Sequence, residues 1–358
     1  MQQYRVSGHP GRDPRRASLP ALRDAALATA SLFVSVYVGS GGLAHFDAAL
    51  AGYFAATVVA CFVATYHVAA FWRRRPSAFY GRMLLGALQR PRQLARVLRS
   101  ARRDLAAQRS IAGRRRSRWV AHLLLSWGTL VSFAVTLPLV CGWVHFEAAG
   151  DRVYEVVVMS VHLGRFATDG IIGWLTFHLL NLAAVAVVIG ATYFLVVRVR
   201  LRRQADAASR FHLAPLLLLL AVALSGLMLP VAGRVGRAWL FPTAALAHEI
   251  AVITLLAVLP YGKLVHMFIR PLQLGVQLMR AESAADARCG RCGAAMAPAV
   301  QVQGVEALLA ARGFHFAGYQ RLCPGCRRRQ LGSVHGQLLG ACFQPRPMAR
   351  RAPLREAA

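Results

Sequence analysis

Six apolar runs, each long enough to cross a bilayer as a helix, constrain this chain more than any other feature. They cover residues 25–46, 51–72, 119–143, 171–197, 213–232 and 243–270. A hydrocarbon core of ~30 Å needs about 20 apolar residues in a helix. The sequence therefore predicts an all-α integral membrane protein with six transmembrane helices. The first run also has features of a signal peptide. We expect it to be retained, because the charge topology closes only with it.

The basic residues predict an orientation. The chain has 43 Lys and Arg against 14 Asp and Glu, and all but one of the basic residues are Arg. The Arg clusters adjoin apolar runs, which indicates cytoplasmic loops and argues against a nucleic-acid partner. We expect both termini and the loops 73–118 and 198–212 inside, the acidic connection 144–170 outside, and a bacterial inner membrane as location.

The chain divides into six predicted regions. These are a cytoplasmic N-terminal tail (1–24), helices one and two (25–72), a basic loop (73–118), a bundle of helices three to six (119–270), a cysteine-bearing cytoplasmic tail (271–345) and a disordered end (346–358). Within the basic loop, apolar residues recur at helical spacing: Leu94, Val97, Leu98, Ala101 and Leu105. This pattern predicts either an amphipathic helix on an anionic inner leaflet or a solvated helical loop.

Histidines inside the spans are the first candidate site. His248 and His266 are 18 residues apart in the last run, which is five turns and about 27 Å of one helix. His178 matches the depth of His248 near the outer face, and His122 matches His266 near the inner face. Imidazole is the usual axial ligand of low-spin haem iron, and helix bundles build such sites. The pattern predicts two haem b sites, one in each leaflet. His67 and His145 are the alternative ligands, and His212 is expected to lie at the inner membrane interface.

Four cysteines in the tail are the second candidate site. They form two C-x-x-C pairs: Cys289 with Cys292, and Cys323 with Cys326. In a cytoplasmic tail this spacing favours a metal over disulfides. We expect zinc, with a mononuclear iron of rubredoxin type as the alternative. A cubane cluster normally uses three Cys from one tight run, and none is present.

Two segments carry a family resemblance. PYGKLVHMFIRPL (260–272) and RSRWVAHLLLSWGTLVSFAVT (116–136) resemble helices of membrane cytochrome b subunits. This family contains the gamma subunit of respiratory nitrate reductase and the membrane subunits of heterodisulfide-reductase-like and sulfite-reduction-associated complexes. The resemblance covers about residues 114–272. It implies that His248 and His266 are axial ligands, one to each haem. Ten residues after His122, where the nitrate reductase subunit has a second His, this chain has Ser132. The sequence therefore leaves open whether the chain binds one haem or two.

The resulting hypothesis is a haem b-containing membrane subunit of a respiratory redox complex. The resemblance implies that it carries electrons between the quinone pool and a cytoplasmic iron–sulfur partner, as one component of a quinol:acceptor oxidoreductase. Two alternatives remain. One is a transporter of major-facilitator type, although no inverted repeat is visible. The other is a membrane-anchored zinc-ribbon adaptor.

Overall fold

The structure is a computed structural model that describes residues 18–73, 77–113, 115–202, 213–261, 263–282, 286–310, 312–314, 316 and 318–340. The predicted disordered end (346–358), residues 1–17 of the predicted N-terminal tail, and His212 lie outside these residues. Contacts divide the chain into a larger unit, Asp13–Leu278, and a second unit that contains Met279–Ala358. We call them the membrane unit and the tail unit, and describe each by itself.

Six helices of the membrane unit are long and apolar enough to cross a membrane, as the sequence predicts and as a multi-pass membrane protein requires. They are α1 (Ser18–Gly39), α2 (Ala51–Arg73), α6 (Arg116–Val140), α7 (Ile171–Arg202), α8 (Ala214–Val235) and α9 (Leu240–Val258). Many of their large apolar side chains face outward; Ile171, for example, is 87% exposed. Such a surface is stable in lipid and not in water.

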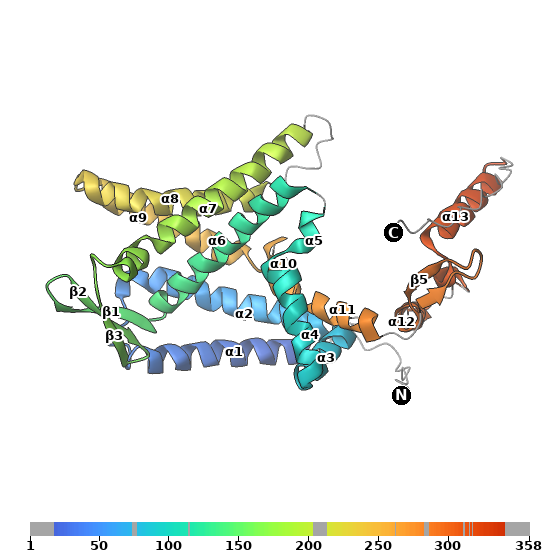
Figure 1. The fold of residues 1–358 in the computed structure, drawn as a ribbon, viewed down its shortest axis with the longest axis horizontal. Helices are drawn as coiled ribbons and strands as arrows, with labels where there is room; N and C mark the ends of the chain where they lie inside the picture. Colours follow the sequence, from blue (N-terminus) through green and yellow to red (C-terminus); the bar gives the residue numbers. More distant parts are fainter. Residues whose placement is uncertain are drawn as a thin grey trace, which may run out of the picture. The chain divides into compact units, whose positions relative to one another are not determined.

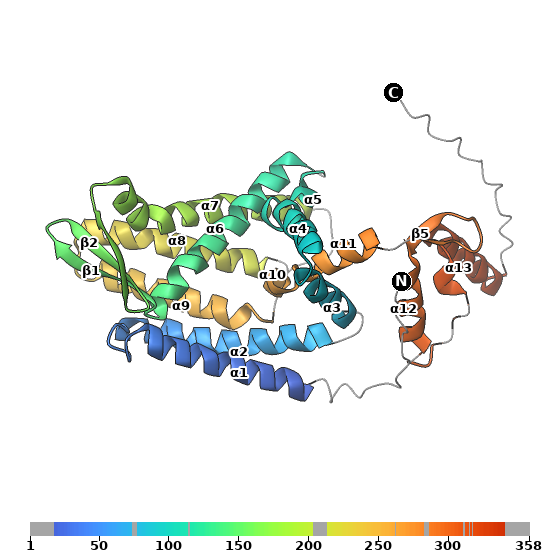
Figure 2. The same cartoon turned by 60° about the horizontal axis from the view of Figure 1, so that its bottom comes forward.

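The helices lie side by side in the order α1, α2, α9, α8, α7, α6 (Figures 1 and 2). The buried centre combines α7, α8 and α9 through Val187, Leu219, Ala223 and Leu255, and residues of α6 pack against it. Helices α6 and α7 approach closely at Gly128 and Gly190. An added Cβ at either glycine would stand less than 3 Å from the backbone of the other helix. Small residues allow this approach in membrane helices.

The last predicted span is shorter than expected. Helix α9 ends at Val258, and a turn, the 3-10 helix η5 (Lys263–Val265) and the short α10 (His266–Ile269) follow. The prediction of one continuous helix over 243–270 is therefore wrong. The physical reason is Pro260, which has no N–H for the helical hydrogen bond. The prediction that five turns of one helix separate His248 from His266 is therefore wrong as well.

The predicted outer connection forms a sheet, which the all-α prediction omitted. Strands β1 (Val144–Gly150), β2 (Val153–Val158) and β3 (Val161–Ala167) make an antiparallel meander in the order β1-β2-β3. Met159 and Ser160 connect β2 to β3 and both have positive φ, as a type I′ turn requires. We call the end of the membrane unit that carries this sheet the sheet end.

The opposite end of the membrane unit, which we call the basic end, carries short helices. These are α3 (Ser77–Leu88), α4 (Pro91–Ser100), the π-helix η3 (Ala101–Ala106) and α5 (Arg109–Ala112), joined by α11 (Leu272–Glu282). Val97 is buried with residues of α3 and α11, and Ala101 and Leu105 pack against the same cluster. Most of the predicted amphipathic stripe thus packs on protein; contact with an anionic leaflet stays a prediction.

The tail unit is a hairpin followed by helices. Strands β4 (Asp286–Arg288) and β5 (Ala295–Pro298) pair antiparallel. Helix α12 (Ala299–Ala310), the 3-10 helix η6 (Tyr319–Arg321) and α13 (Pro324–Leu338) follow. The first cysteine pair lies in the turn between β4 and β5, and the second lies at the start of α13.

Candidate functional site

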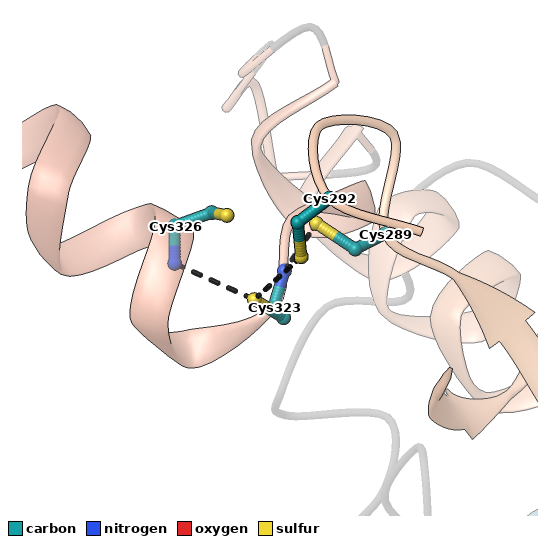
Figure 3. Close-up of side chains that lie close together, drawn as sticks. All are labelled: Cys289, Cys292, Cys323 and Cys326. Atoms are coloured by element: carbon teal, nitrogen blue, oxygen red, sulfur yellow. Dashed lines mark hydrogen bonds between the residues drawn. The ribbon is translucent and has the colours of Figure 1, made fainter. Parts of the chain in front are cut away.

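The four cysteines of the tail unit come together (Figure 3). All four Sγ atoms lie within 4.8 Å of one another, and Cys292 Sγ is 3.7 Å from Cys323 Sγ. A tetrahedral zinc ion with Zn–S bonds of ~2.3 Å separates its sulfurs by about 3.8 Å. The spacing of the thiols therefore fits one tetrahedral ion with little movement. This confirms the predicted grouping, and the kind of metal stays a prediction.

Backbone groups prepare these sulfurs for an ion. The Cys323 N–H donates to Cys289 Sγ (3.2 Å), and the Cys326 N–H donates to Cys323 Sγ (3.4 Å). The first bond is the main reason why the pKa of Cys289 falls to about 6. The second likewise lowers the pKa of Cys323. Burial raises the pKa of Cys326 to about 12. Since a thiolate is the metal-binding form, Cys289 and Cys323 are suited to bind first.

An ion pair between Arg321 and Glu306 connects the segments around the four-cysteine site. The Arg321 guanidinium binds both carboxylate oxygens of Glu306 on α12, at 3.0 and 3.3 Å. The Arg321 carbonyl accepts a hydrogen bond from the Gly290 N–H (3.0 Å), inside the first cysteine turn. Helix α12, η6 and the first turn are thereby joined.

His122 lies near the basic end of α6, where a buried side chain orients it. Its Nδ1 is 2.5 Å from Gln108 Oε1, while Gln108 Nε2 donates to Ser126 Oγ (2.6 Å). The Ser126 hydroxyl gives its own proton to the His122 carbonyl (2.8 Å). It must therefore accept from the Gln108 amide, which turns Oε1 toward the imidazole. His122 accordingly carries its proton on Nδ1 and presents a lone pair on Nε2.

His248 lies at the middle of α9 and has a similar arrangement. Its Nδ1 is 3.0 Å from Ser225 Oγ on α8. Ser225 donates its proton to the Ala221 carbonyl (2.7 Å), so its oxygen accepts from the imidazole. The ring lies over Gly226, where an added Cβ would come within 3.1 Å of Cε1. With Ser225 donating to the Ala221 carbonyl, His248 likewise has its proton on Nδ1 and a lone pair on Nε2.

The proposed opposing ligands, His178 and His266, have different surroundings. His178 lies near the sheet end of α7, where its Nδ1 bonds the Trp174 carbonyl (2.8 Å) and its ring stacks on Trp174. Among the described residues, no hydrogen bond or ring contact joins His178 to His248. His266 begins α10 at the basic end and is exposed. His266 and Arg270 are near enough to His122 to interact with it electrostatically. His122 and His266 thus lie at the same end of the membrane unit, whereas no described contact joins His178 to His248.

Sequence reasoning missed three polar residues beside these histidines. Gln108 and Ser225 orient the imidazoles from other segments of the chain, and no spacing in the sequence predicts that they contact His122 and His248. Glu249 had a signal, because a carboxylate within an apolar span is a candidate functional group. Its side chain lies against Gly52 of α2, where an added Cβ would collide with the carboxylate. Tyr53 is the next residue of α2, and its ring lies 6.5 Å from that of His248.

The alternative ligands lie outside both pairs. His67 of α2 makes an edge contact with the ring of Tyr261, 5.5 Å away, beyond the end of α9. His145 lies on β1, outside the spans.

Comparison with known proteins identifies no relative. No family model, no curated protein and no solved structure matches the chain.

Proposed function

We propose that this chain is the haem b-carrying membrane subunit of a respiratory redox complex. In this proposal it passes electrons between the quinone pool, at the sheet end, and an iron–sulfur partner, at the basic end. The basic end would then face the cytoplasm of a bacterium, as the Arg distribution predicts.

The observation that carries the proposal is the shared state of His122 and His248. Each lies in an apolar helix and has its Nδ1 next to a polar side chain that can accept the proton. Metal-binding histidines almost always donate their second ring nitrogen in this way, which fixes the tautomer and the ring orientation. A histidine with only an interfacial role needs no such partner. The donor set thus fits an axial ligand of haem iron.

The residues then take distinct roles. His122 and His266 would hold one haem near the basic end, while His248, with His178 as the candidate opposing ligand, would hold a second near the sheet end. Bound haem supplies one-electron chemistry. Gln108 and Ser225 hold the imidazole protons at Nδ1, and the apolar helices exclude water. Glu249 offers a carboxylate next to His248 that can take a proton released by quinol.

For the tail unit we propose a structural zinc ion bound by Cys289, Cys292, Cys323 and Cys326. The fit of the sulfur spacing to a tetrahedral ion supports this, and mononuclear iron is the alternative. A folded, metal-stabilised tail would give the soluble partner a defined surface.

A reduced-minus-oxidised visible spectrum of the purified full chain tests the membrane proposal. We expect a b-type alpha band, and haem content that falls in His122→Ala, His248→Ala and His266→Ala. His162→Ala is the matched control, because that histidine lies on β3 outside the helices. A chain expressed with adequate haem that shows no band would exclude the proposal. It would leave the transporter, or an adaptor whose spans only anchor the tail.

A further inference from the structure

A second group of metal-binding side chains lies at the sheet end, outside both sites described above. His45 belongs to the connection between α1 and α2, and His145 and Glu147 belong to β1. One ligand atom from each residue lies within 4.8 Å of the other two. His145 and Glu147 are two positions apart on β1, so their side chains leave the same face of the strand. Segments 100 residues apart thus place three ligands together.

The distances within this group suit an ion. His145 Nε2 is 3.2 Å from Glu147 Oε1. Two ligands of a tetrahedral zinc ion with bonds of ~2.0–2.1 Å are about 3.3 Å apart. The rings of His45 and His145 stack with their centroids 3.9 Å apart and an interplanar angle of 12°. Because an imidazole binds an ion in the plane of its ring, one of these two nearly parallel rings must turn before both can bind the same ion.

His145 also has an unexplained polar atom. Its side chain is 18% exposed, and its Nδ1 is buried with no hydrogen-bond partner among the described residues. Buried polar atoms are nearly always paired, so an orphan calls for an explanation. An ion bound through Nδ1 would pair this atom, whereas an ion bound through Nε2 would leave it as an unpaired N–H.

Hydrogen bonds within the α1–α2 connection fix the His45 segment, and close packing at Gly142 places it beside the start of β1. The Leu43 N–H donates to Ser40 Oγ and the His45 N–H donates to the Ser40 carbonyl, both at 3.0 Å. Gly142, just before β1, approaches so closely that an added Cβ would stand 3.1 Å from the His45 carbonyl oxygen. At Gly41, φ is +63° and an added Cβ would press on the His45 ring at 3.3 Å. The backbone that carries His45 is therefore held in place, and only the side chain has to turn to bind an ion.

We propose that His45, His145 and Glu147 form a binding site for one divalent transition-metal ion, Zn²⁺ or Cu²⁺, at the sheet end. Two imidazoles and one carboxylate match the ligand preference of these ions and leave a coordination position for water. The bound ion would link the α1–α2 connection to the sheet. This site does not depend on the proposed electron transfer.

Zinc content of the purified full chain tests the site, with the tail centre removed as a competitor. In a Cys292→Ser/Cys323→Ser background, stripped by chelator and reloaded with Zn²⁺, we expect about one tightly held zinc per chain. Adding His45→Ala or His145→Ala should weaken zinc binding at least about tenfold, and adding His162→Ala, on the same sheet, should not. Equal zinc binding with and without His45 would overturn the proposal, as would complete loss of zinc with the tail cysteines.

A second measurement guards against a variant that fails to fold. His45→Ala removes a ring that stacks on that of His145, so the unfolding temperatures of the variant and its parent are first measured without metal. Added Zn²⁺ should then raise the unfolding temperature of the parent and not that of His45→Ala. Copper-loaded parent should also show nitrogen coupling from two imidazoles in its electron paramagnetic resonance spectrum. Equal stabilisation of both proteins, or a copper signal that His45→Ala leaves unchanged, would refute the site.

Discussion

Gly190→Ala tests whether the close approach of α6 and α7 holds the membrane unit together. The added Cβ would stand 2.6 Å from the Ala121 carbonyl oxygen and 2.8 Å from the Leu125 nitrogen. Ordinary contact begins near 3.4 Å, so the helices must separate by about 0.8 Å. No flexible side chain can absorb this movement, because the nearest atoms are backbone.

The cost of this crowding follows from overpacking. Inserting a methyl group into a tightly packed interface costs about 1–3 kcal/mol. For a chain of this size each kcal/mol lowers the unfolding temperature by about 2–4 °C, so we expect a fall of about 2–12 °C. Alanine also favours a helix over glycine by about 1 kcal/mol, and that gain must be separated from the crowding.

Gly233→Ala is the matched control. Gly233 lies in α8, and the nearest atom to an added Cβ there is Phe241 Cδ2 at 4.0 Å. Both variants gain the same helix propensity, so the difference in their unfolding temperatures in detergent isolates the crowding. Gly128→Ala crowds the same interface from α6, at 2.7 Å from the Ala183 carbonyl oxygen. The double variant should lose less than the sum of the two single losses, because one separation serves both. If Gly190→Ala unfolds at the same temperature as Gly233→Ala, the helices are not in close contact and the reasoning fails.

Three further predictions concern the polar groups beside the sites. Ser225→Ala removes the acceptor of the His248 Nδ1 proton, which costs about 1–3 kcal/mol; haem content and unfolding temperature should both fall, and unchanged values would show that the bond has no role. Gln108→Leu should likewise lower haem retention at His122, whereas Gln108→Glu, which keeps an acceptor, should largely preserve it; equal loss in both variants would contradict the assigned tautomer. Cys292→Ser should reduce the tail metal, measured by elemental analysis, and expose the tail unit to faster proteolysis; full metal content would remove this thiol from the centre.

The spans were predictable from the sequence because their signal is additive. Mean hydropathy over about 20 residues identifies a helix in lipid, whatever its neighbours are. Helix ends depend on single residues. Helix α1 begins at Ser18, seven residues before the predicted start, because polar residues continue a helix beyond its apolar part. At the other end of the spans, Pro260 stops α9 although apolar residues resume after Lys263.

The candidate sites also differ in whether their signal is local in the sequence or arises only from the fold. The four cysteines were predictable because two ligands in each pair are local, and the metal chemistry supplies the rest. The sheet end was not predictable as a cluster. His45 and His145 are far apart in the chain, and only the fold brings β1 to the α1–α2 connection. The β-branched residues of VYEVVV are typical of a strand, but they do not show where the sheet lies. Gln108 and Ser225 likewise gain their roles from tertiary placement alone.

Hydrogen bonds hold the π-helix η3 on two sides, and η3 leads directly to Gln108, which contacts His122. The indole N–H groups of Trp119 and Trp127 reach across from α6 and bind the carbonyls of the two residues before Gln108, at 2.8 and 3.0 Å. On its other side, Asp104 accepts a bond from Gln277 of α11 (3.0 Å). Gln108, and with it the His122 imidazole, is therefore joined by hydrogen bonds to α6 and, through η3, to α11.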